Sequence, residues 1–334
     1  MKKIAIIGGG SWGTALAIVL TRSATPHRLA LWAHSADIVE MLSTRRINEI
    51  YLPGFPLPAG VEVTGAFEQA IAGADVILGV MPSAHAREMY RAMRPHIEPH
   101  AVFVSATKGL EPATHARISD VIAQEIGPGN SPRIAVLSGP SFAAEVAAGD
   151  PTVVVLAATD AALAAQIQKE FSGPRFRLYT NDDVIGTEIA GAVKNVIAIA
   201  AGVSAGLGLG TNTMAALVTR GLAEMTRLAV ALGGRRETLA GLAGVGDLIL
   251  TSTGALSRNR SVGIELGKGR ELREILGATR MVAEGVGSAA AVLDLARRAG
   301  VEMPITEQVH AVLTAGRASR DAIGELMERR LKQE

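Results

Sequence analysis

The sequence contains no cysteine and no excess of charge of either sign. The missing cysteine excludes disulfides, thiolate nucleophiles and cysteine metal sites, and we expect no metal. With 33 Lys and Arg residues against 32 Asp and Glu residues, no overall field favours nucleic acid or an anionic membrane as a partner. No secretory leader precedes the first apolar run, so we expect a cytoplasmic protein.

Charge is also nearly missing from one long stretch, where Lys194 is the only charged residue between Glu188 and Arg220. Its neighbours are small and apolar. Burial would disfavour the ammonium form and lower the pKa of this lysine toward a range useful for proton transfer. The alternative is a surface lysine that extends to solvent from a packed helix, and position alone leaves both open.

Residues 196–219 carry no charge and are long enough to span a bilayer. Four glycines interrupt this stretch, Gly202, Gly206, Gly208 and Gly210, and polar residues lie within it. The pattern favours two buried helices joined by a glycine-rich turn around 205–210 over one lipid-facing helix. We therefore expect no stable membrane insertion.

The first half alternates short apolar runs with helical stretches, the pattern of a parallel sheet covered by helices. The runs are apolar at consecutive positions, as in strands buried on both faces. Strands are predicted at 3–8, 28–33, 75–80, 101–106, 133–137, 152–157 and 175–179, and helices at 14–23, 84–94 and 114–126. This part, residues 1–181, is predicted to be an α/β domain with a doubly wound, mainly parallel sheet.

After about residue 182 the strand signal disappears. Helices are predicted at 183–203, 211–232, 256–267, 284–298, 305–316 and 319–332. Because the chain length suits two domains, we expect residues 182–334 to form a separate all-α domain.

A glycine-rich turn follows the first predicted strand. Gly8, Gly10 and Gly13 match the pattern G-x-G-x-x-G. The first glycine permits a tight turn, the second lets a pyrophosphate approach the backbone, and the third lets the helix pack on the strand. A strand, this turn and a helix at the head of a βαβ series indicate a Rossmann-like dinucleotide-binding domain, rather than a tight turn without a ligand.

The second predicted strand ends at His34 and Ser35, without an acidic residue. An Asp or Glu there would bind the ribose hydroxyl of NAD and disfavour a 2′-phosphate. His34, Arg45 and Arg46 are candidates to contact that phosphate, while a helix-capping Ser35 and a solvated arginine pair are simpler explanations. The sequence therefore favours NADP(H) and leaves NAD(H) open.

Four further segments combine small, hydroxyl and charged residues: 105–109, 138–145, 244–248 and 257–260. Lys108 follows the carboxyl end of a strand, where open α/β sheets place their ligands. Asp247 follows a flexible glycine turn. Arg258 and Arg260, with hydroxyl and amide neighbours at a predicted helix start, suit a phosphate monoester, and a solvated arginine face is the alternative.

Together these segments resemble the bacterial NAD(P)-dependent glycerol-3-phosphate dehydrogenase family, in order and over essentially the whole chain. The matching segments are 8–17, 51–54, 82–83, 108–109, 138–143, 191–196, 219–225, 241–247, 257–260, 284–286 and 303–305. The resemblance implies a helical domain like that of 6-phosphogluconate dehydrogenase. It also implies reversible hydride transfer between a nicotinamide and C2 of dihydroxyacetone phosphate or sn-glycerol 3-phosphate, which supplies phospholipid biosynthesis. Ala205 stands where the family commonly has an aspartate.

The resemblance also implies which residues act, with Lys194 as the proton donor and acceptor. The matching substrate positions are Lys108, Gly139, Ser141, Asp247, Ser257, Arg258 and Asn259. The matching cofactor positions are Ser11, Trp12, His34, Lys108, Ala143, Arg258, Val282 and Glu284.

Reduction of a ketone builds negative charge on its oxygen, and that charge must be stabilised and protonated. We expect Lys194 to be the acid, Lys108 a second electrostatic stabiliser, and Asp247 the residue that orients Lys194. A nearby lysine would lower the pKa of Lys194 and a carboxylate would raise it, so the net pKa stays open. Asn195 either supports the phosphate or the lysine, or is a satisfied amide within its helix.

Two other functions remain. A dehydrogenase of the same architecture acting on a 3-hydroxy acid would need a carboxylate-binding site where this chain offers residues 257–259. A non-catalytic nicotinamide-binding sensor would leave Lys194, Lys108 and Asp247 idle. The apolar helical domain also allows a homodimer, on general grounds only.

Overall fold

The computed structural model describes residues 1–127, 131–278 and 282–330. The chain divides into two compact units, Met1–Glu188 and Ile189–Glu334. The division expected from the sequence, after residue 181, coincides with the end of the last strand. The first unit extends a few residues further, to Glu188, because it includes the first turn of the following helix.

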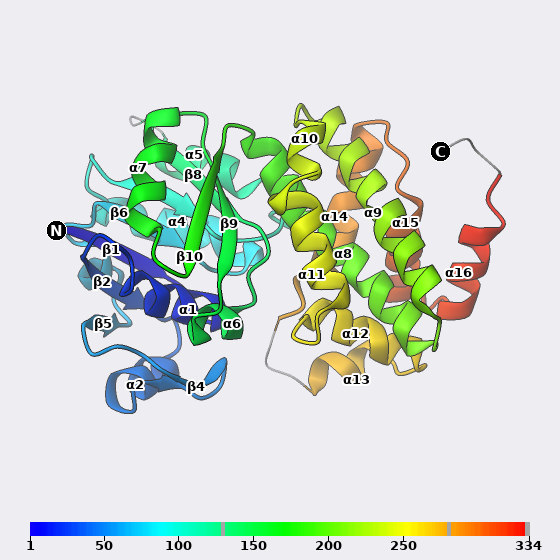
Figure 1. Ribbon diagram of the computed structural model, residues 1–334, viewed down its shortest axis with the longest axis horizontal. Helices are drawn as coiled ribbons and strands as arrows, with labels where there is room; N and C mark the ends of the chain where they lie inside the picture. Colours follow the sequence, from blue (N-terminus) through cyan, green and yellow to red (C-terminus); the bar gives the residue numbers. More distant parts are fainter. Residues whose placement is uncertain (128–130, 279–281, 331–334) are drawn as a thin grey trace. The chain divides into compact units, whose positions relative to one another are not determined.

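The first unit is built on an eight-stranded sheet with the order β10-β9-β8-β7-β6-β1-β2-β5. All its strand pairs are parallel except β8 and β9, which run antiparallel. The strands are β1 Lys2–Ile7, β2 His27–Trp32, β5 Val61–Thr64, β6 Val76–Gly79, β7 Val102–Ser105, β8 Arg133–Ser138, β9 Thr152–Ala157 and β10 Phe176–Asn181. This confirms the predicted mainly parallel sheet (Figure 1).

The seven predicted strands are all present, and three short ones were not predicted. β5 lies at the sheet edge, and only the first of its four residues is fully buried, so it lacks the continuous apolar run of a central strand. The other two, β3 Ile47–Asn48 and β4 Leu52–Pro56, form a small antiparallel pair. Both are too short or too rich in proline and glycine to give a strand pattern.

Helices cover both faces of the sheet, as a doubly wound fold requires. Alternate residues of β1 enter opposite cores: Ile4 and Ile6 pack with α1, α2, α6 and α7, while Ala5 and Ile7 pack with α3, α4 and α5. The helices are α1 Ser11–Leu20, α2 Ala36–Thr44, α3 Phe67–Ile71, α4 Ala86–Met93, α5 Ile118–Ile126, α6 Ala143–Ala148 and α7 Ala161–Phe171, with short 3-10 turns at Ser83–His85 and Arg94–His96.

Two helices of this unit have other boundaries than predicted, and the helix expected at 14–23 is α1, Ser11–Leu20. The sequence predicted a helix over 114–126, but α5 begins only at Ile118. The residues before it form a closed loop, in which Leu110 and Arg117 make an isolated bridge and the Glu111 amide donates to Ala116 O over 2.9 Å. Those backbone groups are already paired across the loop, so they are not available to a helix.

The second unit contains only helices among its described residues, which confirms the predicted all-α domain. Its helices are α8 Val184–Gly206, whose first turns belong to the other unit, α9 Thr211–Ala231, α10 Arg236–Leu239, α11 Asp247–Thr253, α12 Arg258–Gly267, α13 Leu272–Gly277, α14 Glu284–Arg298, α15 Pro304–Ala315 and α16 Ser319–Met327, with a π-helical turn at Leu242–Gly246. The predicted last helix, 319–332, ends earlier, and residues 331–332 lie outside the described part.

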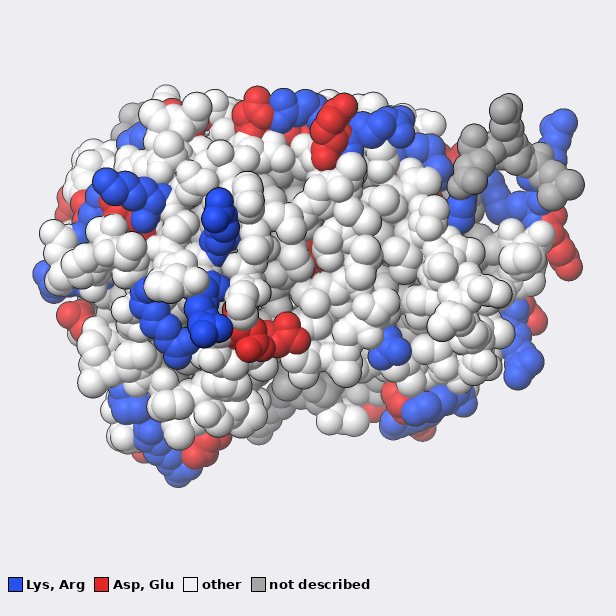
Figure 2. All heavy atoms as spheres, viewed as in Figure 1, with Lys and Arg blue, Asp and Glu red and all other residues white. Residues whose placement is uncertain are grey.

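The apolar helix α8 meets the length and hydropathy criteria of a membrane span, but 83% of its most apolar window is buried inside the protein. It continues through Gly202 and ends at Gly206. The expected turn therefore lies at Leu207–Gly210, and Gly202 does not interrupt the helix. Both signs of charge occur on the visible face of each unit (Figure 2), as the balanced composition suggests.

Candidate functional site

The turn between β1 and α1 has the geometry of a dinucleotide-binding turn. Gly8 has φ +139°, and a Cβ on it would lie 2.4 Å from Val80 O. A Cβ on Gly13 would lie 1.8 Å from Gly8 O, so only glycine allows the helix this close to the strand. A Cβ on Gly10 would meet nothing within 4 Å, which leaves open space where a pyrophosphate would approach.

A buried asparagine that the sequence did not single out supports this turn. Asn48 is fully buried, and its Nδ2 donates to Gly9 O and to Thr14 Oγ1, both over 2.9 Å. Its Oδ1 accepts from the Tyr51 amide. The sequence around Asn48 gives no signal of this role. Two of its three partners, Gly9 and Thr14, lie more than thirty residues away in the sequence.

The other residues of α1's first turn fit a bound ligand. Gly10 precedes the helix and no side chain caps it, so the first amides of Ser11 and Trp12 point outward from a helix N-terminus. The Nε1–H of Trp12 is buried without an acceptor among the described residues. An orphaned donor beside an open glycine turn is consistent with a dinucleotide at these predicted cofactor positions.

The end of β2 presents one exposed candidate for a 2′-phosphate. His34 is exposed, with its ring 5.9 Å from that of Trp32. Arg45 pairs with Glu49 over 2.8 Å, and the guanidinium of Arg46 binds the backbone oxygens of residues 58 and 61. The two arginines are therefore engaged locally. Ser35 precedes α2 but makes no side-chain capping bond.

Three predicted substrate positions come together at the carboxyl ends of the neighbouring strands β7 and β8. Lys108 Nζ donates to Gly139 O over 2.8 Å and lies 3.5 Å from Ser141 Oγ. Ser141 Oγ also donates to Gly139 O over 3.0 Å. Gly139 has φ +118°, a conformation that favours glycine. Ala143, a predicted cofactor position, begins α6 two residues further on.

Lys194 is buried, with a side-chain exposure of 6%. Its Nζ lies 2.6 Å from Asp247 Oδ1 and 2.8 Å from Thr251 Oγ1. The lysine is therefore buried and does not extend to solvent, and Asp247 and Thr251 are its close polar partners. Thr251 was not predicted, although its position one helical turn after Asp247 places both side chains on the same face.

The segment before Asp247 is not the flexible turn that its glycines suggested. Leu242–Gly246 forms a π-helical turn that continues into α11, and Asp247 is fully buried at its end. A Cβ on Gly244 would lie 2.0 Å from Leu239 O. The glycine is there for close packing, so the carboxylate is held rigidly against the lysine.

A chain of amides links three helices of the second unit. Asn259 Nδ2 donates to Asn195 Oδ1, and the Gly285 amide donates to Asn259 Oδ1, each over 2.9 Å. Asn195 Nδ2 contacts Gly191 O within its own helix at 3.3 Å. The two asparagines thus hold α8, α12 and α14 in place.

The remaining predicted positions differ in exposure. Ser257 is buried and caps α12, because its Oγ accepts from the Arg260 amide over 3.2 Å. Arg258 is exposed at the first position of that helix, and Val282 is half exposed before α14, which Glu284 begins. Among the described residues, no group of three or more His, Asp or Glu side chains is arranged to hold a metal ion.

A glycine-turn dinucleotide unit followed by a helical unit with a buried lysine–aspartate pair defines a class of two-unit nicotinamide-dependent oxidoreductases. Sequence families described as the N-terminus and C-terminus of NAD-dependent glycerol-3-phosphate dehydrogenase match residues 3–164 and 183–324. The chain therefore belongs to the NAD-dependent glycerol-3-phosphate dehydrogenase family.

Relatives from several bacteria align with this chain over nearly their full length. A glycerol-3-phosphate dehydrogenase [NAD(P)+] of Koribacter versatilis is 55% identical over 98% of both chains. One of Geobacter sulfurreducens is 50% identical over 100% of this chain and 99% of its own. The crystal structure of glycerol-3-phosphate dehydrogenase from Coxiella burnetii, 42% identical, covers 98% of this chain and 99% of its own with a TM-score of 0.93.

Proposed function

We propose that this protein catalyses the reversible reduction of dihydroxyacetone phosphate to sn-glycerol 3-phosphate with a nicotinamide cofactor. Family membership supports the reaction. The observation that carries its chemistry is the buried cluster of Lys194, Asp247 and Thr251, in which two partners fix the proton donor. General acid catalysis needs such a fixed group within reach of the reacting oxygen.

Lys194 supplies the proton of this reaction. The cofactor, when bound at the Gly8–Gly13 turn, supplies the hydride that adds to C2 of the ketone. The carbonyl π-bond breaks toward oxygen, and that oxygen takes a proton from Lys194 Nζ. The lysine is left neutral beside Asp247 and Thr251, which hold it, and it regains its proton from solvent. In the reverse direction the same lysine accepts the alcohol proton.

Lys108 contributes a second positive charge toward the developing oxyanion. Its ammonium group is held at the sheet edge by Gly139 O, so its position is fixed before reaction. A preorganised charge stabilises a transition state more effectively than one that must reorient. Gly139 and Ser141 lie with Lys108 at this edge and complete the proposed substrate contacts there.

Arg258 binds the phosphate of the substrate. Its guanidinium is exposed at the start of α12, and an arginine fork at a helix N-terminus suits phosphate oxygens. Ser257 and Asn259 support it indirectly, because one caps the helix and the other belongs to the amide chain. Their proposed role in substrate binding is therefore to hold Arg258 in place.

NADP(H) is the favoured cofactor, and NAD(H) is also used. This preference rests on the missing acidic residue after β2 and on the exposed ring of His34. Arg46 binds backbone oxygens and Arg45 pairs with Glu49 at the surface, so His34 is the proposed contact of the 2′-phosphate, and a modest preference follows. The enzyme supplies glycerol phosphate for phospholipid synthesis in the cytoplasm.

A panel of substrates tests the reaction against its closest rival. The protein should oxidise NADPH in the presence of dihydroxyacetone phosphate and much more slowly with unphosphorylated dihydroxyacetone. The reverse assay should show activity with glycerol 3-phosphate and none with 3-hydroxy acids. Activity on a 3-hydroxy acid would favour the rival dehydrogenase, and cofactor binding without oxidation of any substrate would favour a sensor.

A further inference from the structure

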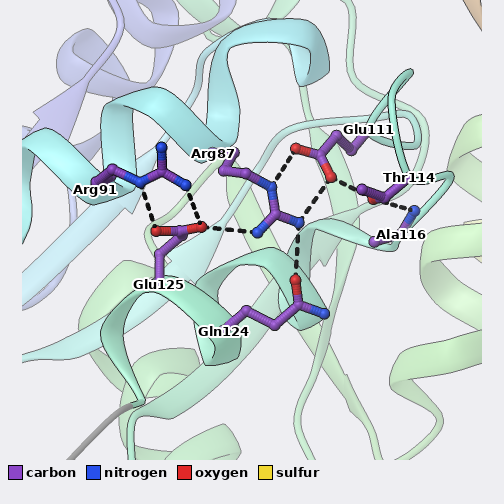
Figure 3. A network of polar contacts seen from close by, with 7 residues as sticks. All are labelled: Arg87, Arg91, Glu111, Thr114, Ala116, Gln124 and Glu125. Atoms are coloured by element: carbon purple, nitrogen blue, oxygen red, sulfur yellow. Dashed lines mark hydrogen bonds and ion pairs between the residues drawn. The ribbon is translucent and has the colours of Figure 1, made fainter.

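Arg87 is the centre of a polar network in the first unit that the proposed chemistry does not use (Figure 3). It lies on α4, and its Nε and Nη2 donate to the two carboxylate oxygens of Glu111 over 2.6 and 2.8 Å. Nη1 donates to Glu125 over 2.7 Å, and Nη2 also donates to Gln124 over 2.8 Å. A two-point arginine–carboxylate contact of this kind is among the strongest polar pairs in proteins.

Glu111 is the residue that closes the loop between β7 and α5. Its amide donates to Ala116 O over 2.9 Å, and its carbonyl accepts from the His115 amide over 2.8 Å. Its carboxylate also accepts from the Thr114 hydroxyl. His115 has φ +61°, so the loop is held in a tight backbone conformation. Glu111 therefore fixes this loop through its main chain and its side chain together.

Lys108 lies three residues before Glu111 in the same segment. On the strand side, the Thr107 hydroxyl donates to Met81 O over 2.8 Å. Gly109, with φ +140°, turns the chain from Lys108 into the closed loop. The backbone at Lys108 is thus fixed on one side by the sheet and on the other by the Glu111 contacts.

The Glu111 carboxylate depends on Arg87. Glu111 is only 5% exposed, and the hydrogen bonds from Arg87 are the main reason why the pKa of this carboxyl lies below its usual range. A carboxylate this buried is costly to leave without its cation. Loss of Arg87 should therefore move the carboxylate toward solvent and carry the loop with it.

We propose that Arg87 is a positioning residue that sets the placement of Lys108 through Glu111. This inference rests on the role proposed for Lys108. Arg87 touches neither substrate nor cofactor, so it acts by keeping the Lys108 ammonium where the developing negative charge forms. Misplacement of a reacting or stabilising group by about an ångström can lower the rate up to about a hundredfold.

Arg91 is a matched control within the same network. It lies one helical turn after Arg87 and donates to both oxygens of Glu125 over 3.0 and 3.1 Å. No hydrogen bond joins it to Glu111, and its side chain is 67% exposed. Arg91→Ala removes an arginine and an ion pair but leaves the Glu111 loop in place, and exposed pairs of this kind contribute little.

The first measurement is hydrogen exchange of the backbone amides, which does not depend on activity. Arg87→Ala should speed exchange in residues 108–117, while Arg91→Ala should leave these amides at the wild-type rate. Equal exchange rates of these amides in Arg87→Ala and wild type would overturn the inference, whatever the catalytic activity of the variant. This result is also independent of whether dihydroxyacetone phosphate is the substrate.

The second measurement is a double-mutant cycle of kcat/KM for dihydroxyacetone phosphate reduction. Arg87→Ala should lower kcat/KM about ten- to a hundredfold in the wild-type background and less than about twofold in the Lys108→Ala background, because coupled residues are not additive. Arg91→Ala should lie within about twofold of wild type. Equal losses from Arg87→Ala in both backgrounds would show a general structural effect and overturn the proposal.

The two proposals fail in different ways. If Lys108→Ala reduces the ketone as fast as wild type, the role proposed for Lys108 is wrong, and with it the catalytic consequence inferred for Arg87. If Lys108→Ala is slow and Arg87→Ala is as fast as wild type, only the inference about Arg87 is wrong.

Discussion

At the scale of single residues, the buried Lys194 contrasts with the exposed Arg258. Lys194 has a carboxylate and a hydroxyl within 2.8 Å. Arg258 is the contrasting case, because its guanidinium is exposed at a helix start. Substitution of a buried paired group leaves its partner buried without a counter-charge. Substitution of an exposed group removes only its contact with the ligand. The two kinds of residue therefore need different controls.

Arg258→Ala should raise the KM for dihydroxyacetone phosphate by about 10- to 100-fold, the range expected for a lost charge-assisted hydrogen bond. Turnover at saturating substrate should fall much less, since the proton donor is unchanged. Steady-state kinetics measure both values. Arg273→Ala, an exposed arginine of α13, is the matched control, and an unchanged KM in the Arg258 variant would refute the phosphate contact.

Glu224 should make stability depend on pH. This residue of α9 accepts bonds from the Ile305 amide over 2.7 Å and from the amide and hydroxyl of Thr306. Burial raises its pKa to about 7, above the unfolded value of about 4.3. The folded state then holds a proton that the unfolded state has released, so this residue's contribution is full at low pH and is lost as the pH rises from about 4.5 to 7.

Glu224→Gln removes that titration while it keeps a neutral amide of similar size. Thermal unfolding midpoints from pH 5 to pH 8 should decline more steeply for wild type than for the variant. Glu307→Gln, an exposed substitution in the first turn of α15, serves as control. Parallel declines for wild type and Glu224→Gln would contradict a raised pKa for this carboxyl.

At the scale of helices and strands, glycines set how closely the core helices of the second unit approach. Gly202 and Gly206 of α8 face Gly263 and Gly267 of α12, each pair of glycines spaced by four residues. A Cβ on Gly202 would lie 2.1 Å from Arg260 O, and one on Gly263 would lie 2.1 Å from Ile199 O. The obstructing atoms are backbone, so neither helix can yield by rotating a side chain. These glycines permit close packing and do not break the helix. The interpretation from the sequence, that Gly202 interrupts this stretch, was wrong.

Gly202→Ala should therefore destabilise the second unit by about 1–3 kcal/mol, the usual cost of overpacking. Gly324→Ala is the matched control. Gly324 lies inside α16, and a Cβ there would meet nothing within 4 Å. This control should stabilise the protein by about 0.5–1 kcal/mol, because alanine favours helix over glycine. Thermal or urea unfolding measures both variants, and equal stabilities would refute the close approach of α8 and α12.

At the scale of the whole molecule, local sequence patterns predicted most of the strands and helices. Contacts between residues far apart in the sequence determined the features that were missed. Continuous apolar runs mark the seven predicted strands, and the spacing of Gly8, Gly10 and Gly13 marks the dinucleotide turn. Asn48 and Thr251 were missed because their roles depend on partners that only the fold brings near. Similarly, the rigid turn before Asp247 depends on Leu239 O lying 2.0 Å from an added Cβ, which no glycine count reveals.

The central claim is that Lys194 protonates the substrate while a separate glycine turn holds the cofactor. The most direct measurement follows the absorbance of NADPH and NADH in parallel during dihydroxyacetone phosphate reduction, for wild type and Lys194→Ala, with the NADPH dissociation constant of each protein as the control for folding. Wild type should oxidise both cofactors, NADPH the more efficiently. The variant should bind NADPH as wild type does and turn over about 10²- to 10⁴-fold more slowly. A variant that binds NADPH and keeps near-normal turnover would contradict the account.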